Sequence, residues 1–243
     1  VGIKMVYNGP TSRTPDHQPL FGPLPGVKNY FIAAGYAAGF VQAGFTKQVA
    51  QWIVEGEPDT DMSELDVRRF GPHATRGFTY SVVHAGHAFS NLPSYPYGER
   101  GAGRPGRTSA LHDLLAKAGA VFGVRNGWEV PNWFAKDGVE GKEKLGFCRP
   151  NWFDTVGEEC RRAAEGVGVL DLSYASKFEI VGPGSMEALD RAFACSVPRS
   201  DGQVVYGPML TAKGGIATCM TIVRMAADRF ILIGPGEYET RDF

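Results

Sequence analysis

The hydrophobic pattern changes its period once within the first fifty or so residues. Residues 29–34 (NYFIAA) form a short apolar run with an aromatic start, which is typical of a buried β-strand. Further along, hydrophobic residues follow at helical spacing as Val41, Phe45, Val49, Trp52 and Ile53. The pattern predicts a strand, a tight turn between Gly35 and Gly39, and a helix.

A glycine turn between a strand and a helix favours a ligand site. Residues without a Cβ let a ligand approach the backbone, and the free N–H groups of the first helical turn suit an anionic group. Two alternatives compete. Residues 30–45 are apolar enough to suggest a membrane span, but they include Gln42 and fall short of the required length of about 20 residues. The glycines could also serve only helix packing, because a full G-x-G-x-x-G fingerprint is missing.

Turn-forming residues dominate positions 8–26, which predicts a loop without regular structure, either a rigid connector or a cover for a cofactor. The helix is predicted to end at Gly56-Glu57-Pro58. Residues 71–107 form a composition break that indicates an inter-domain connector. Within it, His84 and His87 could share a helix face, but no third metal ligand is near in sequence, so a metal site is disfavoured.

A new pattern starts at Thr108, which we expect to be the N-cap of a short helix with an apolar face of Leu111, Leu114, Leu115 and Ala118. Residues 119–123 predict a strand, and residues 127–134 an aromatic-rich turn region. Trp128 and Trp133 could stack on a flat ligand, although core packing is the favoured interpretation.

The last part of the sequence predicts an α+β domain. Residues 158–166 read as an amphipathic helix, 167–173 as an apolar strand that carries Asp171, and 177–181 as a second strand. Ser185 is expected to cap a helix over 186–194. Alternation then predicts antiparallel strands over 206–211, 215–224 and 229–233.

Composition narrows the classes of function. The 243 residues are 43% hydrophobic with a formal net charge of −1, which gives no electrostatic footprint for nucleic acid. The four cysteines lie far apart without a C-x-x-C motif, so the sequence indicates neither a zinc site nor a disulfide framework, and no metal is expected. A reducing, cytoplasmic compartment fits best. The chain does not begin with Met, and we expect it to be a fragment.

Two sets of motifs carry a family resemblance. The first comprises Asn8-Gly9-Pro10, Pro15-Asp16, Pro19, Gly22-Pro23, Gly35-Tyr36-Ala37-Ala38-Gly39 and Gly56-Glu57-Pro58. The second comprises Ser109-Ala110-Leu111-His112, Gly119-Ala120-Val121-Phe122-Gly123, Gly127-Trp128-Glu129, Asp171-Leu172-Ser173 and Leu210-Thr211-Ala212-Lys213-Gly214-Gly215. The first set resembles the end of the flavin domain in the dimethylglycine dehydrogenase and sarcosine dehydrogenase family. The second resembles the folate-binding domain that follows it, which is shared with the glycine cleavage T-protein.

The resemblance implies a fold class of α/β plus α+β. Residues 1–70 would be the C-terminal part of a flavin-binding, D-amino-acid-oxidase-like domain, 71–107 a connector domain, and 108–243 the N-terminal part of a T-protein-like folate-binding domain. It also implies FAD as cofactor, with contacts from Pro15, Asp16, Gly35, Tyr36, Ala37, Ala38, Gly39 and Phe40. A helix N-terminus aimed at the flavin would stabilise its reduced state by about 0.3–2 kcal/mol.

The implied activity is oxidative demethylation of a small N-methylated amino acid, with oxygen or electron-transfer flavoprotein as electron acceptor. The oxidised amine would release formaldehyde or pass its one-carbon unit to tetrahydrofolate, for which the expected contacts are Tyr206, Ala217, Thr218 and Cys219. The sequence departs from the T-protein pattern here, because Thr218 and Cys219 replace an acidic residue that assists folate attack. Folate-assisted transfer is therefore open to question. Asp171 matches the family and is interpreted as structural.

Other functions stay open at this point. A non-catalytic regulatory relative of the same architecture would keep both domains as a binding scaffold, which the Thr218-Cys219 replacement motivates. A stand-alone folate-dependent aminomethyltransferase is disfavoured by the flavin-like residues 1–70. The expected location is the cytoplasm, or the mitochondrial matrix in a eukaryote.

Overall fold

The computed structural model describes residues 2–6, 9–35, 43–89 and 93–243, and its chain divides into two compact units. The first unit comprises Val1–Arg69 and Ala74–Pro93, and the second Phe70–His73 and Ser94–Phe243. The chain therefore enters the second unit for four residues before it returns to the first.

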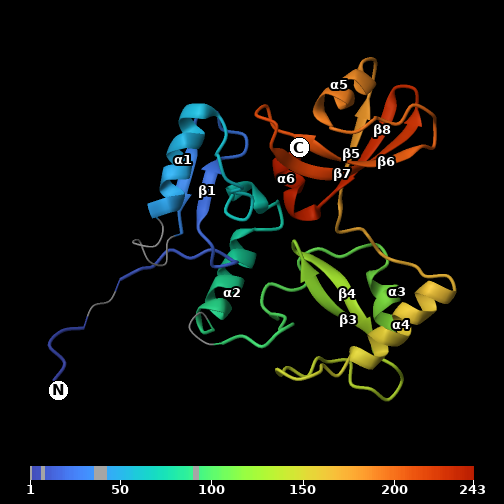
Figure 1. Cartoon of the computed structure of the whole chain (residues 1–243). Coiled ribbons are helices and arrows are strands. Elements are labelled where there is room, and N and C mark those ends of the chain that lie inside the picture. Colours follow the sequence, from blue (N-terminus) through green and yellow to red (C-terminus); the bar gives the residue numbers. More distant parts are fainter. Residues whose placement is uncertain (1, 7–8, 36–42, 90–92) are drawn as a thin grey trace. The chain divides into compact units, whose positions relative to one another are not determined.

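The first unit pairs a short hairpin with helices (Figure 1). Strands β1 (Leu20–Pro23) and β2 (Phe31–Ala34) are antiparallel, with Phe21 opposite Ala33. Helix α1 spans Ala43–Glu55, the 3₁₀ turn η2 spans Val67–Arg69, and helix α2 spans Arg76–His87.

A small aromatic core holds this unit together. Its buried residues are Phe21, Val49, Trp52, Met62 and Leu65. Gly22 has a backbone φ of +103°, and a Cβ there would lie 2.8 Å from the Trp52 ring. Because β1 and α1 approach this closely, only glycine fits beside the tryptophan.

Two predictions for the first unit need correction. Residues 8–26 are not wholly irregular, because β1 forms within them once β2 offers a partner for its backbone. The strand at β2 is not buried, since Ala33 and Ala34 are exposed. The connector assigned to residues 71–107 stays a prediction, and it contains the twelve-residue helix α2, whose N-cap Thr75 accepts a hydrogen bond from the Phe78 backbone N–H.

The end of α1 is as predicted. Gly56 follows the helix with a φ of +85°, and its N–H donates to the Trp52 carbonyl at 2.9 Å. The predicted start of this helix and most of the glycine turn fall on residues 36–42, which lie outside the described residues.

The second unit begins with a hairpin flanked by two helices. Helix α3 spans His112–Lys117, strand β3 Ala120–Arg125, strand β4 Trp128–Phe134 and helix α4 Phe153–Glu165. The strands are antiparallel and joined at Asn126-Gly127, where both residues have positive φ. This is the backbone of a type I′ turn, for which Asn-Gly is a favoured sequence.

A four-stranded antiparallel sheet completes the second unit, in the order β5-β8-β7-β6. Its strands are β5 (Ser176–Val181), β6 (Val204–Leu210), β7 (Ile216–Ala226) and β8 (Arg229–Gly234). Helix α5 (Ser185–Ala192) follows β5, and η3 (Gly236–Tyr238) and α6 (Glu239–Asp242) follow β8 (Figure 1).

The two faces of this sheet differ. We call the face that packs against α5 the covered face, and it holds the buried residues Met220, Ile222, Phe230 and Leu232 together with Leu189, Phe193 and Val197. The opposite face, the outer face, carries Tyr206 and Cys219, which alternate with the core residues along β6 and β7. The strands predicted over 206–211, 215–224 and 229–233 are confirmed.

Several predictions for the second unit are wrong. The first helix begins at His112 rather than after Thr108, and its N-cap is Leu111. Residues 127–134 form β4, not an irregular turn region. Residues 167–173 form no strand, and Val167 and Val169 are almost fully exposed. Apolar content suggested a strand there, but no neighbouring strand pairs with it among the described residues.

The expected cap of α5 is also wrong. Ser185 is the first residue of the helix, and the N-cap is Gly184 with a φ of +87°. The Ser185 hydroxyl is buried instead, without a hydrogen-bond partner among the described residues. No α-helix in the described part of the chain combines the length and hydropathy needed to cross a membrane.

Candidate functional site

Three of the expected flavin contacts, Pro15, Asp16 and Gly35, lie at the β1–β2 hairpin or in the loop before it. Gly35 directly follows β2 with a φ of +80°, and a Cβ there would lie 3.0 Å from Thr14 Cγ2. The glycine is therefore required both by the backbone conformation and by the close approach of the preceding loop. Tyr36, Ala37, Ala38, Gly39 and Phe40 lie outside the described residues.

Asp16 is held by a network that shapes the loop before β1. Its carboxylate accepts hydrogen bonds from the Thr14 hydroxyl at 3.0 Å and the Gln18 N–H at 3.0 Å, and it pairs with the Arg69 guanidinium at 2.7 Å. Arg69 also donates to the Gln18 carbonyl at 3.2 Å. This arrangement gives Asp16 and the neighbouring Pro15 a positioning role for the loop, since the charge of the carboxylate is already matched.

The expected folate contacts in the second unit divide between the faces of the sheet. Pro208 is opposite Cys219 and Tyr206 is opposite Thr221, so Tyr206 and Cys219 share the outer face. Thr218 lies opposite Met209 and points to the covered face, where only 4% of it is exposed. Of the two residues in place of the acid, only Cys219 faces the tyrosine.

Tyr206 and Cys219 interact on this face. The Tyr206 side chain is 69% exposed, and its hydrogen bond with the Cys219 thiol raises the pKa of the phenol above its ordinary value. The phenol therefore stays neutral over a wider pH range than a free tyrosine, and it offers a ring on which a flat heterocycle can stack.

Ala217 borders the same site from the start of β7. The register shifts there, because Leu210 pairs with Ile216 and Met209 with Thr218, which leaves Ala217 as the extra residue of a β-bulge. Its carbonyl accepts a hydrogen bond from the Arg241 guanidinium at 2.8 Å. Of the four expected folate residues, Tyr206 and Cys219 share the outer face, Thr218 points to the covered face, and Ala217 lies at the bulge.

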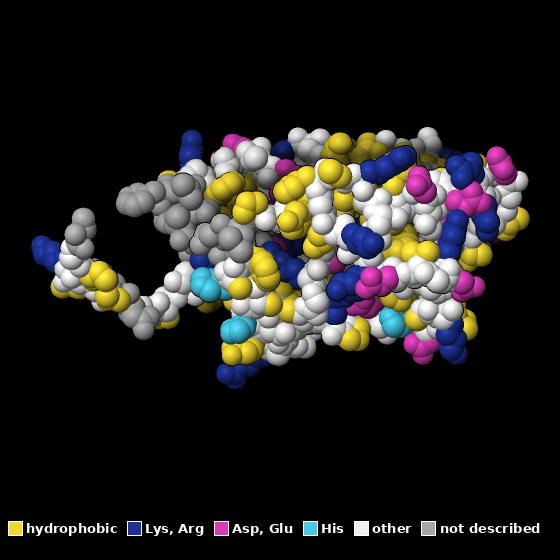
Figure 2. Space-filling view, turned by 90° about the horizontal axis from the view of Figure 1, so that it is seen from below, with side chains coloured by type: hydrophobic (Ala, Val, Ile, Leu, Met, Phe, Trp, Pro, Cys, Tyr) yellow, Lys and Arg dark blue, Asp and Glu magenta, His cyan; other side chains and the backbone are white. Residues whose placement is uncertain are grey.

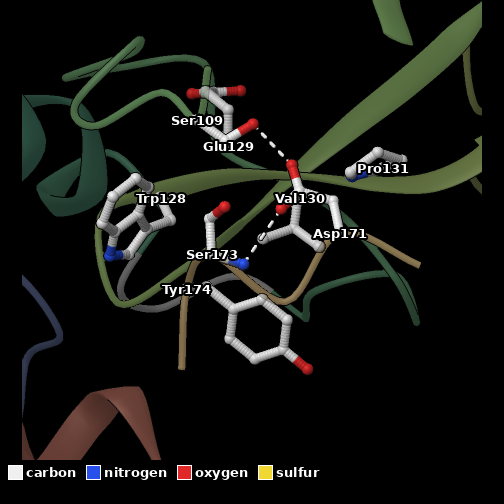
Figure 3. Close-up of a pocket in the computed structure, with 8 residues that line it drawn as sticks. All are labelled: Ser109, Trp128, Glu129, Val130, Pro131, Asp171, Ser173 and Tyr174. Atoms are coloured by element: carbon white, nitrogen blue, oxygen red, sulfur yellow. Dashed lines mark hydrogen bonds between the residues drawn. The ribbon is translucent and has the colours of Figure 1, made fainter. Parts of the chain in front are cut away.

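A polar crevice lies elsewhere in the second unit, at the contact between β4 and the turn before β5 (Figure 3). Ser109 donates to Asp171 Oδ2 at 2.5 Å, and the Ser173 N–H donates to Asp171 Oδ1 at 2.9 Å. Partial burial acts to raise the pKa of Asp171, but these hydrogen bonds outweigh it, and the pKa lies below its ordinary value. The crevice is also lined by Trp128, Glu129, Val130, Pro131 and Tyr174.

This crevice is a structural junction rather than a ligand cavity. Its interior is too narrow to hold even a water molecule. Glu129 is held by Arg104, whose Nε donates to its Oε1 at 2.9 Å. The Trp128 ring is covered by the Arg107 guanidinium, 4.2 Å from the ring centroid. The interpretation of Asp171 as structural agrees with these contacts, although it lies in the irregular segment before β5 and not in a strand.

The two tryptophans considered as ligand platforms are both engaged in packing. Trp133 is 1% exposed, and Trp128 lies under Arg107. His84 and His87 both lie on α2, where His84 stacks on Tyr80 with ring centroids 6.0 Å apart.

On the face shown in Figure 2, basic and acidic side chains are interspersed rather than separated by sign.

The decisive observation is a pair of family matches in the predicted order. Residues 111–243 match the GCVT N-terminal domain, and residues 55–109 match the FAD dependent oxidoreductase central domain. The chain belongs to the GCVT family. The predicted fold class, the end of a flavin oxidoreductase domain followed by a T-protein-like domain, is confirmed. The boundaries at residues 70 and 107 stay predictions.

Similar proteins agree with this assignment. Mouse dimethylglycine dehydrogenase is 38% identical over 98% of the chain. Human sarcosine dehydrogenase is 32% identical over 93%, and the mouse pyruvate dehydrogenase phosphatase regulatory subunit is 33% identical over 98%. The chain spans only 27–28% of the length of these relatives. The predicted family resemblance is confirmed, whereas the individual site residues stay predictions.

Sequence reasoning missed two parts of the site region. The Asn126-Gly127 hairpin carried a recognisable signal, because Asn-Gly between two alternating runs predicts a type I′ turn. Arg241 carried no such signal. It lies 24 residues from Ala217 in sequence, and only the tertiary structure brings its guanidinium to the Ala217 carbonyl.

Proposed function

We propose that this chain is part of a flavin-dependent enzyme that demethylates a small N-methylated amino acid of the dimethylglycine or sarcosine type. The proposal is carried by the two family matches in one chain, in the order oxidoreductase then GCVT. The similarity to dimethylglycine dehydrogenase and sarcosine dehydrogenase supports this class of substrate. The similarity of the chain to mitochondrial proteins supports the mitochondrial matrix as its location in a eukaryote.

In this proposal the first unit provides one wall of the flavin site. Bound FAD would supply the two-electron oxidation of the N-methyl carbon. Arg69 fixes the Thr14–Gln18 loop, and Gly35 packs against this loop. Together they would hold the end of β2, where the predicted flavin-contact segment begins. The described residues fit this supporting role, because Gly35 packs against Thr14 with no space for a side chain.

The second unit would bind tetrahydrofolate, which would accept the one-carbon unit. Tyr206 provides an exposed ring and a neutral hydroxyl on the outer face. The position beside it, where the T-protein pattern has an acid, holds the thiol of Cys219 instead of a carboxylate. The residues present therefore fit folate binding better than they fit assisted transfer, because the thiol does not offer a carboxylate's charge to the reacting amine.

The first experiment is a visible absorption spectrum of the complete purified protein without oxygen. Adding dimethylglycine or sarcosine should bleach the flavin band, and betaine, which has no lone pair on its nitrogen, serves as a comparison. A flavin band that no amine bleaches would contradict the proposed dehydrogenase. A complete protein without any flavin would contradict the proposed cofactor.

A second experiment tests the role of the outer face. With a substrate that bleaches the flavin, Cys219→Asp should raise the share of the one-carbon unit captured by tetrahydrofolate relative to free formaldehyde. Cys219→Ser is the matched control, since it changes the side chain without adding a charge. An equal product ratio in both variants would show that this position takes no part in transfer.

A regulatory protein of the same architecture is the second candidate. It is favoured by Cys219 in place of an acid beside Tyr206 and by the 33% identity with the pyruvate dehydrogenase phosphatase regulatory subunit. Absence of flavin bleaching, together with retained binding of a reduced folate, would support this candidate over the enzyme.

A further experiment identifies the electron acceptor of the proposed enzyme. The bleached flavin is mixed with oxygen or with electron-transfer flavoprotein, and the rates at which each reoxidises it are compared.

A further inference from the structure

The register shift near Ala217 leaves this residue outside the regular pairing of β6 and β7. Leu210 pairs with Ile216 and Met209 with Thr218, so Ala217 has no directly opposite residue on β6. The extra residue of a bulge leaves its backbone polar groups without regular partners. Another group must therefore satisfy the Ala217 carbonyl.

Arg241 provides that group. Its Nη2 donates to the Ala217 carbonyl at 2.8 Å, and its Nε donates to Asp242 Oδ1 at 2.8 Å. The guanidinium also lies 3.9 Å from the centroid of the Tyr238 ring. These contacts restrain the planar guanidinium in a way that a flexible ammonium group cannot reproduce.

The anchor is shielded from water. The Arg241 side chain is 12% exposed, and the Asp242 side chain 2%. Hydrogen bonds in such a setting are stronger than those on a surface, because water competes less for the donor. By contrast, Arg229 on the same sheet is 54% exposed and pairs with Glu179 across the surface.

The anchored residue lies at the edge of the proposed folate site. Ala217 is two residues from Cys219, which faces Tyr206, and two residues from Gly215, which closes the turn between β6 and β7. Thr211 N–H donates to the Gly215 carbonyl at 2.7 Å across that turn. Holding Ala217 in place therefore also holds the end of the β6–β7 turn and the β7 segment that carries Cys219.

We propose that Arg241 is a positioning residue for folate: by holding the Ala217 carbonyl, it sets the position of the Ala217–Cys219 segment relative to Tyr206. This inference rests on the proposed folate site. Arg241 holds the Ala217 carbonyl, and we infer that its effect on a ligand passes through the bulge.

The test uses the complete protein and two measurements on Arg241→Gln. Hydrogen exchange of the 211–219 backbone should become faster, while exchange in α4 should stay unchanged. The Kd for 5-formyltetrahydrofolate, a stable reduced folate, should rise about tenfold. This is the change in Kd expected when one charged hydrogen bond is lost.

Three further variants separate positioning from general destabilisation. Arg241→Lys keeps the charge and one donor, and should recover part of the affinity. Asp242→Asn breaks the ion pair but leaves the Ala217 hydrogen bond available, and should raise the Kd less than Arg241→Gln. Arg229→Gln, on an exposed arginine of β8, should leave both measurements unchanged.

Each contrary outcome is distinct. Faster exchange in Arg241→Gln with an unchanged Kd would overturn the positioning role and leave the folate site standing. Unchanged exchange at 211–219 would overturn the anchor itself. Failure of the unsubstituted protein to bind the reduced folate would overturn the proposed folate site first, and the positioning role with it.

Discussion

The two faces of the β5–β8 sheet come from the same strands but differ in chemistry. The covered face packs Met220, Ile222 and Phe230 against α5, and these residues are at most 1% exposed. The outer face presents Tyr206, which is 69% exposed, beside Cys219. Because side chains alternate along a strand, neighbours such as Thr218 and Cys219 belong to different environments. The comparison teaches that one face maintains the fold and the other is available for function.

The largest expected effect is on the covered face. Phe230→Ala should lower the free energy of unfolding by about 3–5 kcal/mol, because it leaves a cavity where a ring is fully buried. Urea denaturation measures this change. Tyr206→Ala is the control on the outer face and should change the free energy by less than about 0.5 kcal/mol. Equal losses in both variants would contradict the distinction between the faces.

A smaller effect, of opposite sign, is expected at Thr218. Its hydroxyl is buried on the covered face without a hydrogen-bond partner among the described residues. Thr218→Val keeps the shape and removes the buried polar group, so the free energy of unfolding should rise by about 1 kcal/mol. Thr221→Val, on the outer face, should show no such gain. A loss of stability in Thr218→Val would reveal a partner such as a bound water.

The ion pair between Glu179 and Arg229 tests how little the outer face contributes to stability. Glu179 Oε1 lies 2.6 Å from Arg229 Nε, but both side chains are about half exposed. Glu179→Gln should lower the free energy of unfolding by less than about 1 kcal/mol, and the difference should shrink in added salt. A larger, salt-independent loss would place this pair among the groups that maintain the fold.

The smallest change in stability is expected for Cys219→Ala, which instead tests the contact on the outer face. The hydrogen bond with Cys219 raises the pKa of Tyr206, so removing the thiol should lower that pKa toward its ordinary value. The phenol would then ionise at lower pH than in the unsubstituted protein. Ultraviolet absorbance of phenolate follows the titration, with Tyr206→Phe to identify the signal. An unchanged titration would show that the two side chains do not interact.

Much of the second unit was predictable from local pattern. The alternation over β6, β7 and β8 was sufficient, because each strand buries one face and exposes the other. The hairpin was misread at residues 127–134, although Asn126-Gly127 carried its signal. The apolar residues 167–173 were misread because hydrophobicity alone does not show whether a pairing strand exists.

The candidate sites were predictable only in part. Motif order identified the family, and the position of Tyr206 followed from it. The different directions of Thr218 and Cys219 depend on the register between β6 and β7, which a one-residue shift would reverse. The network of Asp16 with Arg69 joins residues 53 apart in sequence, and no local pattern encodes such a pair.

The sequence by itself determined the family and the order of the two domains through its motifs, and most strands of the second unit through short-range periodicity. Only the tertiary structure decided that Cys219 faces Tyr206, that Thr218 is buried and that Arg241 holds Ala217. These features depend on strand register, on a bulge and on the docking of α6. Each of them is fixed by contacts between residues that are distant in the chain.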